Sequence, residues 1–95
     1  EFINKEPEKL ILGLNPNPVT EQHLMLKFNG TKEGTMYVKI LDEKGITRKY
    51  VQLYAQRGIN NAHIHLDKNI FKNGTYHLYC SMGMLKESVR FIINN

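Results

Sequence analysis

Short segments of alternating apolar and polar side chains constrain the fold of this chain more than any other feature. A period of two puts every second side chain on one face, as in a β-strand that is buried on one side. Gly, Pro, Asn and Asp separate most segments at spacings of about 8 to 12 residues, which is typical of an all-β sandwich. The pattern predicts an all-β fold of about seven antiparallel strands, at residues 9–14, 23–28, 35–42, 46–54, 62–66, 75–80 and 85–93.

The chain is large enough for one domain and little more. It has 95 residues, of which 41% are hydrophobic, and this supports a modest core without a metal or disulfides. No apolar run approaches the roughly 20 residues that cross a membrane as a helix. Nothing near Glu1 resembles a secretory signal peptide, so we expect any export signal to lie on a longer precursor. Residues 1–8 are charged and lack a period, and we expect them to be a linker before a domain at residues 9–95.

The basic residues are scattered along the sequence. Lys and Arg number 13 against 9 Asp and Glu, so the formal net charge is +4. A nucleic-acid surface would need basic residues clustered and interleaved with aromatics, and no run of that kind is present. We therefore expect solvated strand faces and no nucleic-acid partner.

Two histidines form the best candidate for a metal site. His63 and His65 stand two apart on a predicted strand, so both side chains leave the same face and could share a metal ion. A site needs at least one further ligand, and no other ligand residue stands at a telling spacing. We interpret both side chains, together with His23 and His77, as ordinary exposed histidines. The sequence thus predicts no metal and no cofactor.

Residues suited to catalysis are sparse. Ser81 and Ser88 are the only serines, and neither lies in a nucleophile-elbow sequence. The acidic residues fall mostly in predicted turns, and no Gly-rich phosphate loop is present. Cys80 is in register with Tyr76 and Leu78, so we expect it to be buried in the core. We assign no catalytic residue and expect no enzymatic activity.

Four kinds of connection between the predicted strands can be interpreted from the sequence. In residues 14–19, Leu-Asn-Pro-Asn-Pro-Val, each proline fixes its own φ and holds the preceding residue extended, which predicts a stiff connection. Residues 42–45 predict a hairpin, because Gly45 can supply a positive φ. Asn29-Gly30 and Asn73-Gly74 begin matches to the N-glycosylation pattern, but Asn-Gly also favours tight turns, and we interpret both as turns. We expect the connection at residues 67–73 to plug the end of the core with Ile70 and Phe71.

Taken together, five pieces in this order resemble the C-terminal sorting domain of proteins exported by the type IX secretion system of Bacteroidota. In that family a Pro-Asn-Pro element, an amphipathic strand, an Asp-x-x-Gly hairpin, a Gly-x-Tyr element and a Lys-led closing strand follow one another. The matching residues are Pro16, Asn17 and Pro18; residues 23–28; residues 38–45 with Asp42 and Gly45; residues 70–76; and residues 86–93.

The resemblance implies a fold and a function. The domain would be an immunoglobulin-like β-sandwich and a non-catalytic signal at the end of a larger cargo protein. The outer-membrane type IX translocon would recognise it in the periplasm and carry the cargo to the cell surface or the medium. A cell-surface sortase would then cleave in or before residues 1–8, a polar segment that suits protease access.

The resemblance also places the signal in the last two strands, at about residues 73–95. Lys86 and Arg90 point outward in the predicted strand and are the expected contacts with the translocon, whereas apolar members of the set would pack in the core. If the last strand lies at a sheet edge, its backbone groups could pair with a partner strand or with a second copy in a homodimer. The residues on which we expect the signal to depend are Gly74, Tyr76, Lys86, Val89, Arg90 and Phe91.

The main alternative is a generic extracellular β-sandwich that binds carbohydrate or protein at the end of a secreted enzyme. Carbohydrate modules usually present a flat aromatic platform, and this chain has no Trp. Its tyrosines look scattered in the sequence, which disfavours the alternative. They stand at positions 37, 50, 54, 76 and 79.

Overall fold

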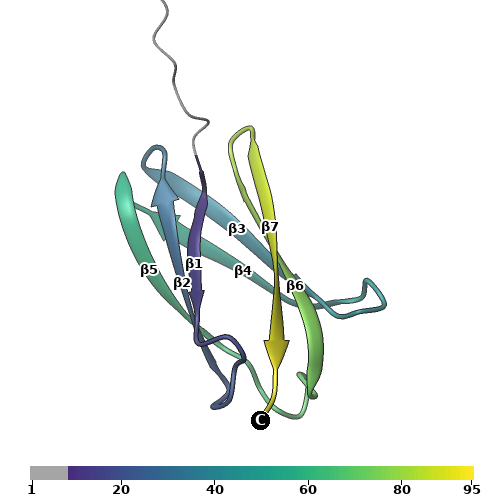
Figure 1. The fold of residues 1–95 in the computed structure, drawn as a ribbon. Helices are drawn as coiled ribbons and strands as arrows, with labels where there is room; N and C mark the ends of the chain where they lie inside the picture. The colour runs from purple at the N-terminus through teal and green to yellow at the C-terminus, as the bar shows by residue number, and fades with distance from the viewer. Residues whose placement is uncertain (1–8) are drawn as a thin grey trace, which may run out of the picture.

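The computed structural model describes residues 9–95 as a sandwich of two antiparallel sheets (Figure 1). One sheet has the order β1-β2-β5 and the other the order β4-β3-β6-β7, which confirms the predicted all-β sandwich. In this described part of the chain, no helix is long and apolar enough to span a membrane. The predicted linker at residues 1–8 lies outside it. The strands are β1 (Ile11–Asn15), β2 (His23–Gly30), β3 (Gly34–Leu41), β4 (Thr47–Ala55), β5 (Gly58–His65), β6 (Gly74–Met82) and β7 (Leu85–Ile93).

The fourth strand lies beside β3, at the edge of the four-stranded sheet, and the chain then crosses to the other sheet at residues 56–57. Its register slips by one residue: Ile40 is opposite Lys49, but Leu41 is opposite Thr47. Arg48 is therefore an extra residue, which makes a β-bulge. The imperfect alternation of residues 46–54 suggested an edge strand or a bulge, and β4 is both.

The core is formed by the alternate side chains of both sheets. Every inward position expected in β2 and β3 is buried, and Cys80 is buried as predicted. Burial raises the pKa of the Cys80 thiol to about 12, so the side chain stays neutral and acts as a small apolar group. Full burial of one Leu, Ile or Phe side chain stabilises the fold by about 1.5–3 kcal/mol. The largest fully buried side chains are Phe28, Phe71, Phe91, Leu10, Leu24, Leu26, Met36, Ile40, Ile64, Leu66, Leu78 and Met82.

Asn29-Gly30 is not the predicted turn. Both residues belong to β2, opposite Ile59 and Gly58 of β5. Glycine is required here for another reason, because a Cβ on Gly30 would lie 2.0 Å from the carbonyl oxygen of Gln56. The connection between β4 and β5 at residues 56–57 can pass this close to β2 only because residue 30 has no side chain.

Two other predictions need correction. Phe71 is buried beside Tyr76, but Ile70 is half exposed, so only one of the two plugs the core. The backbone N–H groups of both residues donate to the carbonyl of Asp67, and this tight turn directs only one of two successive side chains inward.

The strand expected at residues 62–66 begins earlier, at Gly58, because backbone pairing with β2 extends it through a segment of low β-propensity.

Gly30→Ala should lower the free energy of unfolding by about 1–3 kcal/mol, because the added methyl group overlaps a backbone oxygen that cannot easily move. Gly13→Ala is the matched control, since its Cβ would meet nothing within 4 Å. Urea unfolding of both variants measures the difference. Equal stabilities of the two variants would contradict the close approach of Gln56.

Candidate functional site

The apolar residues expected in the signal are core residues of the C-terminal hairpin, β6–β7. Tyr76 and Phe91 are opposite each other, and their rings stack with centroids 5.9 Å apart. The Tyr76 hydroxyl donates to the carbonyl of Lys72 at 2.7 Å, and burial raises its pKa above the ordinary value, so it remains a donor. Val89 is half-buried against the same core. These three side chains hold the hairpin to the sandwich, as the sequence led us to expect.

The charged residues expected in the signal lie on the outer face of the same hairpin. Lys86 is opposite Ser81, Arg90 is opposite His77, and both basic side chains are exposed. Gly74 begins β6 with a φ of +150°, a conformation that favours glycine. Lys86 and Arg90 are therefore available for contact, whereas Gly74 serves the geometry of the backbone.

The outer edge of β7 is partly covered and partly open. The N–H and C=O of Ile92 point away from β6, since they bond to Asn17 and Val19. In an antiparallel pair these directions alternate, so the same groups of Lys86, Ser88 and Arg90 also face outward. Among residues 9–95 no hydrogen-bond partner is found for these outward groups. This stretch of β7 is an open edge of the kind that accepts another strand.

The proline run covers the remaining part of that edge. Val19 donates to the Ile92 carbonyl at 2.7 Å and accepts from the N–H of Asn94 at 2.8 Å, forming a short parallel bridge. The side-chain oxygen of Asn17 accepts from the Ile92 N–H at 3.1 Å. The peptide bonds before Pro16 and Pro18 are cis. The run connects β1 to β2, as predicted, and it also holds the end of the last strand.

The hairpin at Asp42–Gly45 is confirmed and reaches the start of β6. Gly45 has a φ of +82°, and its N–H donates to the Asp42 carbonyl. The Asp42 carboxylate accepts from the N–H groups of Ile46 and Lys44 and from Arg48; the bond from Ile46 does most to lower its pKa. Next to it, Glu43 accepts from the N–H of Thr75. A small pocket of about 220 Å³ lies between this hairpin and residues 73–76.

Segments far apart in the sequence therefore meet at one end of the C-terminal hairpin. Thr75 and Ile92 are opposite each other across β6 and β7. Glu43 binds the first of these residues, and Asn17 binds the second. The structure thus brings together the proline run, the Asp42–Gly45 hairpin and the Gly74–Tyr76 element, while Lys86 lies toward the other end of β7.

A carboxylate that sequence reasoning missed joins the two sheets. Glu87 of β7 accepts from the N–H groups of Leu10 and Ile11, at 2.6 and 2.9 Å. Leu10 and Ile11 are 77 and 76 positions away from Glu87 in the sequence, and no local pattern signals a contact over such a distance. Glu87 stands at an inward position of the strand, and that is the only sequence hint of its role.

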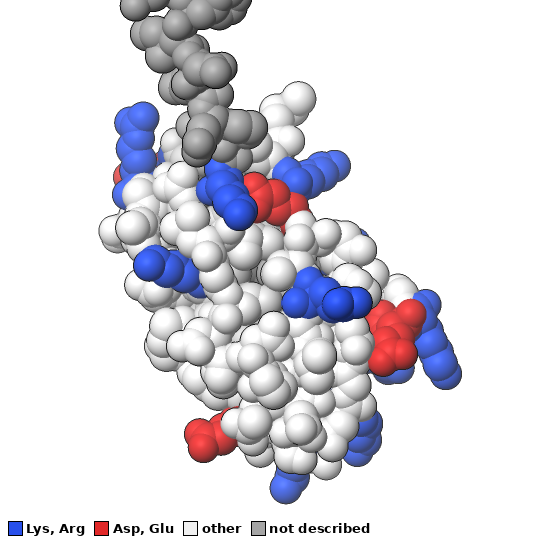
Figure 2. Space-filling model, in the orientation of Figure 1, with Lys and Arg blue, Asp and Glu red and all other residues white. Residues whose placement is uncertain are grey.

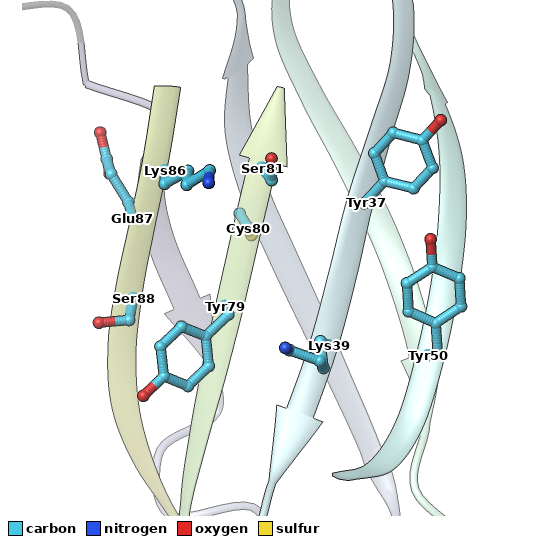
Figure 3. Close-up of a pocket in the computed structure, with 9 residues that line it drawn as sticks. All are labelled: Tyr37, Lys39, Tyr50, Tyr79, Cys80, Ser81, Lys86, Glu87 and Ser88. Carbon is cyan, nitrogen blue, oxygen red and sulfur yellow. The ribbon is translucent and has the colours of Figure 1, made fainter. Parts of the chain in front are cut away.

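Three of the five tyrosines lie close together in space. Tyr37, Tyr50 and Tyr79 share the outer face of the four-stranded sheet and line an open groove of about 510 Å³ (Figure 3). The rings of Tyr37 and Tyr50 stack with centroids 6.3 Å apart, and the Lys39 ammonium lies 5.9 Å from the centre of the Tyr79 ring. The expectation from the sequence was wrong because these residues lie on three strands.

The charged side chains and the potential metal ligands complete the description of the surface. On the face that carries β1 and β7, Lys and Arg side chains are spread singly with acidic residues among them (Figure 2). Within residues 9–95, no group of three or more His, Cys, Asp or Glu side chains could hold a metal ion. One pair is closer than expected, however: His23 of β2 contacts His63 of β5.

No protein-family model matches the chain, and no curated protein matches it. Among solved structures, the fold is similar to part of a variant β-glucosidase from Listeria innocua, crystallised in complex with laminaribiose. The TM-score is 0.52 and the sequence identity 9%, over 93% of this chain and 16% of the enzyme. The similarity is one of fold, and this chain spans only a small part of that enzyme.

Glu87→Ala should lower the free energy of unfolding by about 1–3 kcal/mol, because two backbone N–H groups beside buried side chains lose their acceptor. The control is Glu21→Ala, which removes an exposed carboxylate and should change stability by less than about 0.5 kcal/mol. Urea unfolding measures both variants. An effect of Glu87→Ala no larger than that of the control would contradict the proposed link between the sheets.

Proposed function

We propose that this chain is a C-terminal sorting domain: a non-catalytic signal that directs an attached cargo protein through the type IX secretion system across the outer membrane. Its partners would be the cargo, the outer-membrane translocon and a cell-surface sortase that removes the domain. The domain would pass through the periplasm and reach the cell surface or the medium. The proposal assigns binding, not catalysis, to the C-terminal hairpin.

One observation carries the proposal. Asn17 of the proline run bonds to Ile92 of the closing strand, 75 residues away, and Glu43 of the Asp42–Gly45 hairpin bonds to Thr75 of the Gly-x-Tyr element, 32 residues away. The two contacted residues, Thr75 and Ile92, are opposite each other across β6 and β7. A chance set of short motifs has no reason to converge on one hairpin. Their convergence supports reading them as a single unit that shapes the end of the chain.

The surface of β7 supports recognition by a partner. Its open edge at residues 86–90 offers backbone groups for strand pairing, which gives affinity with little dependence on sequence. Lys86 and Arg90 stand on the exposed face of the same stretch and could select an acidic partner. Asn17 and Val19 cover only the far end of the edge, so they restrict pairing to the part that carries the two basic side chains.

The proposal is tested by fusing residues 1–95 to a periplasm-directed reporter in a bacterium that has a type IX system. We expect the reporter outside the cell, and we expect the double variant Lys86→Ala, Arg90→Ala to lower its export several-fold. Both side chains are exposed, so this variant should fold. A truncation after Ser81 would be a poor test, because it removes the core side chains of β7.

The matched control is the double variant Lys27→Ala, Lys68→Ala, which removes the same charge from exposed positions outside the hairpin. Its export should equal that of the unaltered fusion. Retention of the unaltered fusion in the periplasm would overturn the proposal. Equal losses in the two double variants would show that net charge, and not the face of β7, governs export.

The tyrosine groove favours a second candidate function, a carbohydrate-binding module. Aromatic faces stack on the apolar faces of sugar rings, while the nearby Ser81, Ser88 and Lys39 side chains can hydrogen-bond to hydroxyl groups. The resemblance of the fold to part of a β-glucosidase is compatible with this candidate.

Native gels that contain a soluble polysaccharide test this candidate. Slower migration of the chain in the presence of the polysaccharide, abolished by Tyr37→Ala and Tyr50→Ala, would favour carbohydrate binding over the sorting function.

A further inference from the structure

Three histidines share the outer face of the three-stranded sheet. His23 of β2 is directly opposite His65 of β5, and His63 is opposite Met25. All three histidine side chains are exposed. Because outward side chains on neighbouring antiparallel strands lie within reach of each other, including along the diagonal, His23 can contact either histidine of β5.

The contact is with the diagonal neighbour. The Nε2 atom of His23 lies 2.5 Å from the Nδ1 atom of His63, and the ring centroids are 4.7 Å apart with a tilt of 37°. Two ring nitrogens therefore point at each other across the strand pair. Among residues 9–95, neither imidazole has a carboxylate or carbonyl partner.

The backbone beneath the pair is held firmly. β2 and β5 stay in register over eight consecutive residue pairs without a bulge. Leu24 and Ile64, which follow the two histidines in β2 and β5, are buried on the other side of the sheet. The Cα positions of His23 and His63 are thus fixed, while the exposed rings can adjust by rotating about their side-chain bonds. Such preorganisation lowers the cost of binding a ligand between them.

The geometry points to a two-histidine site for a divalent transition-metal ion, held between Nε2 of His23 and Nδ1 of His63. Metal–nitrogen bonds of about 2.0–2.1 Å place two ligand nitrogens about 2.9–3.4 Å apart for bond angles between 90° and 110°. To reach this spacing the rings need to separate by less than about 1 Å, and they need to rotate about their side-chain bonds so that both lone pairs converge on the ion. With the ion bound, both facing nitrogens act as lone-pair donors and the proton between them is released to solvent.

The donor set defines the class of ion. Imidazole nitrogens suit Zn²⁺, Ni²⁺ and Cu²⁺, whereas Mg²⁺ and Ca²⁺ take oxygen ligands. Within residues 9–95 no third ligand completes a cluster, so water would occupy the remaining positions. An open site of this kind binds more weakly than a closed structural zinc site, and it leaves the fold independent of the metal.

The test is calorimetric titration of the metal-stripped chain with ZnCl₂ and NiCl₂ at neutral pH in a buffer that does not bind metals. We expect one ion per chain and no binding of MgCl₂. His23→Ala and His63→Ala each remove one of the two protein ligands and should weaken binding by more than about tenfold. Losing a group that only hydrogen-bonds to a metal ligand already costs about that much affinity. In NMR spectra of the unaltered chain, the imidazole signals of these two residues should respond first to the metal.

The controls are His65→Ala, on the same face opposite His23, and His77→Ala, on the other sheet. Both variants should bind Zn²⁺ and Ni²⁺ as the unaltered chain does. All four histidines lie on outward faces of strands, so each variant should fold, and circular dichroism checks this. The site would be overturned by any of three results. The unaltered chain fails to bind the metal, both His23→Ala and His63→Ala retain binding, or His65→Ala loses as much affinity as they do.

Discussion

The tie between the first and last strands is the contact on which this sandwich most depends. β1 and β7 belong to different sheets, and a sandwich that buries its side chains between two sheets must keep their edges together. Glu87 does this at one end of β7 through the N–H groups of Leu10 and Ile11. At the other end of β7, Asn17 and Val19 of the connection that follows β1 bond to Ile92 and Asn94.

The tie also explains how the edge of β7 is divided. Residues 17–19 occupy the end of the edge, which leaves the stretch that carries Lys86 and Arg90 open to a partner. The proline run thus has a structural task that bears on recognition, because it sets where an added strand could pair. A sorting signal built in this way would need an intact N-terminal strand as well as the C-terminal hairpin.

Most of the fold could be predicted from the sequence, because alternation is a local signal. The inward residues of β2, β3 and β6 and the hairpin at Gly45 follow from nearest neighbours alone. Glu87, the His23–His63 pair and the tyrosine groove could not be predicted, because each joins strands that are distant in the sequence. Gly30 shows a different error. The Asn-Gly pair favours a turn locally, but Gly30 lies in a strand, and it is a glycine because the carbonyl of Gln56 approaches it closely.

Amide hydrogen exchange tests the tie most directly. The N–H groups of Val19 and Asn94 are the donors of the bridge between the proline run and β7. We predict that both exchange only when the whole domain unfolds, with the same free energy as Leu78 in the middle of β6. Exchange of these two amides at the rate of an exposed loop, while Leu78 stays protected, would contradict the view that the proline run holds the last strand.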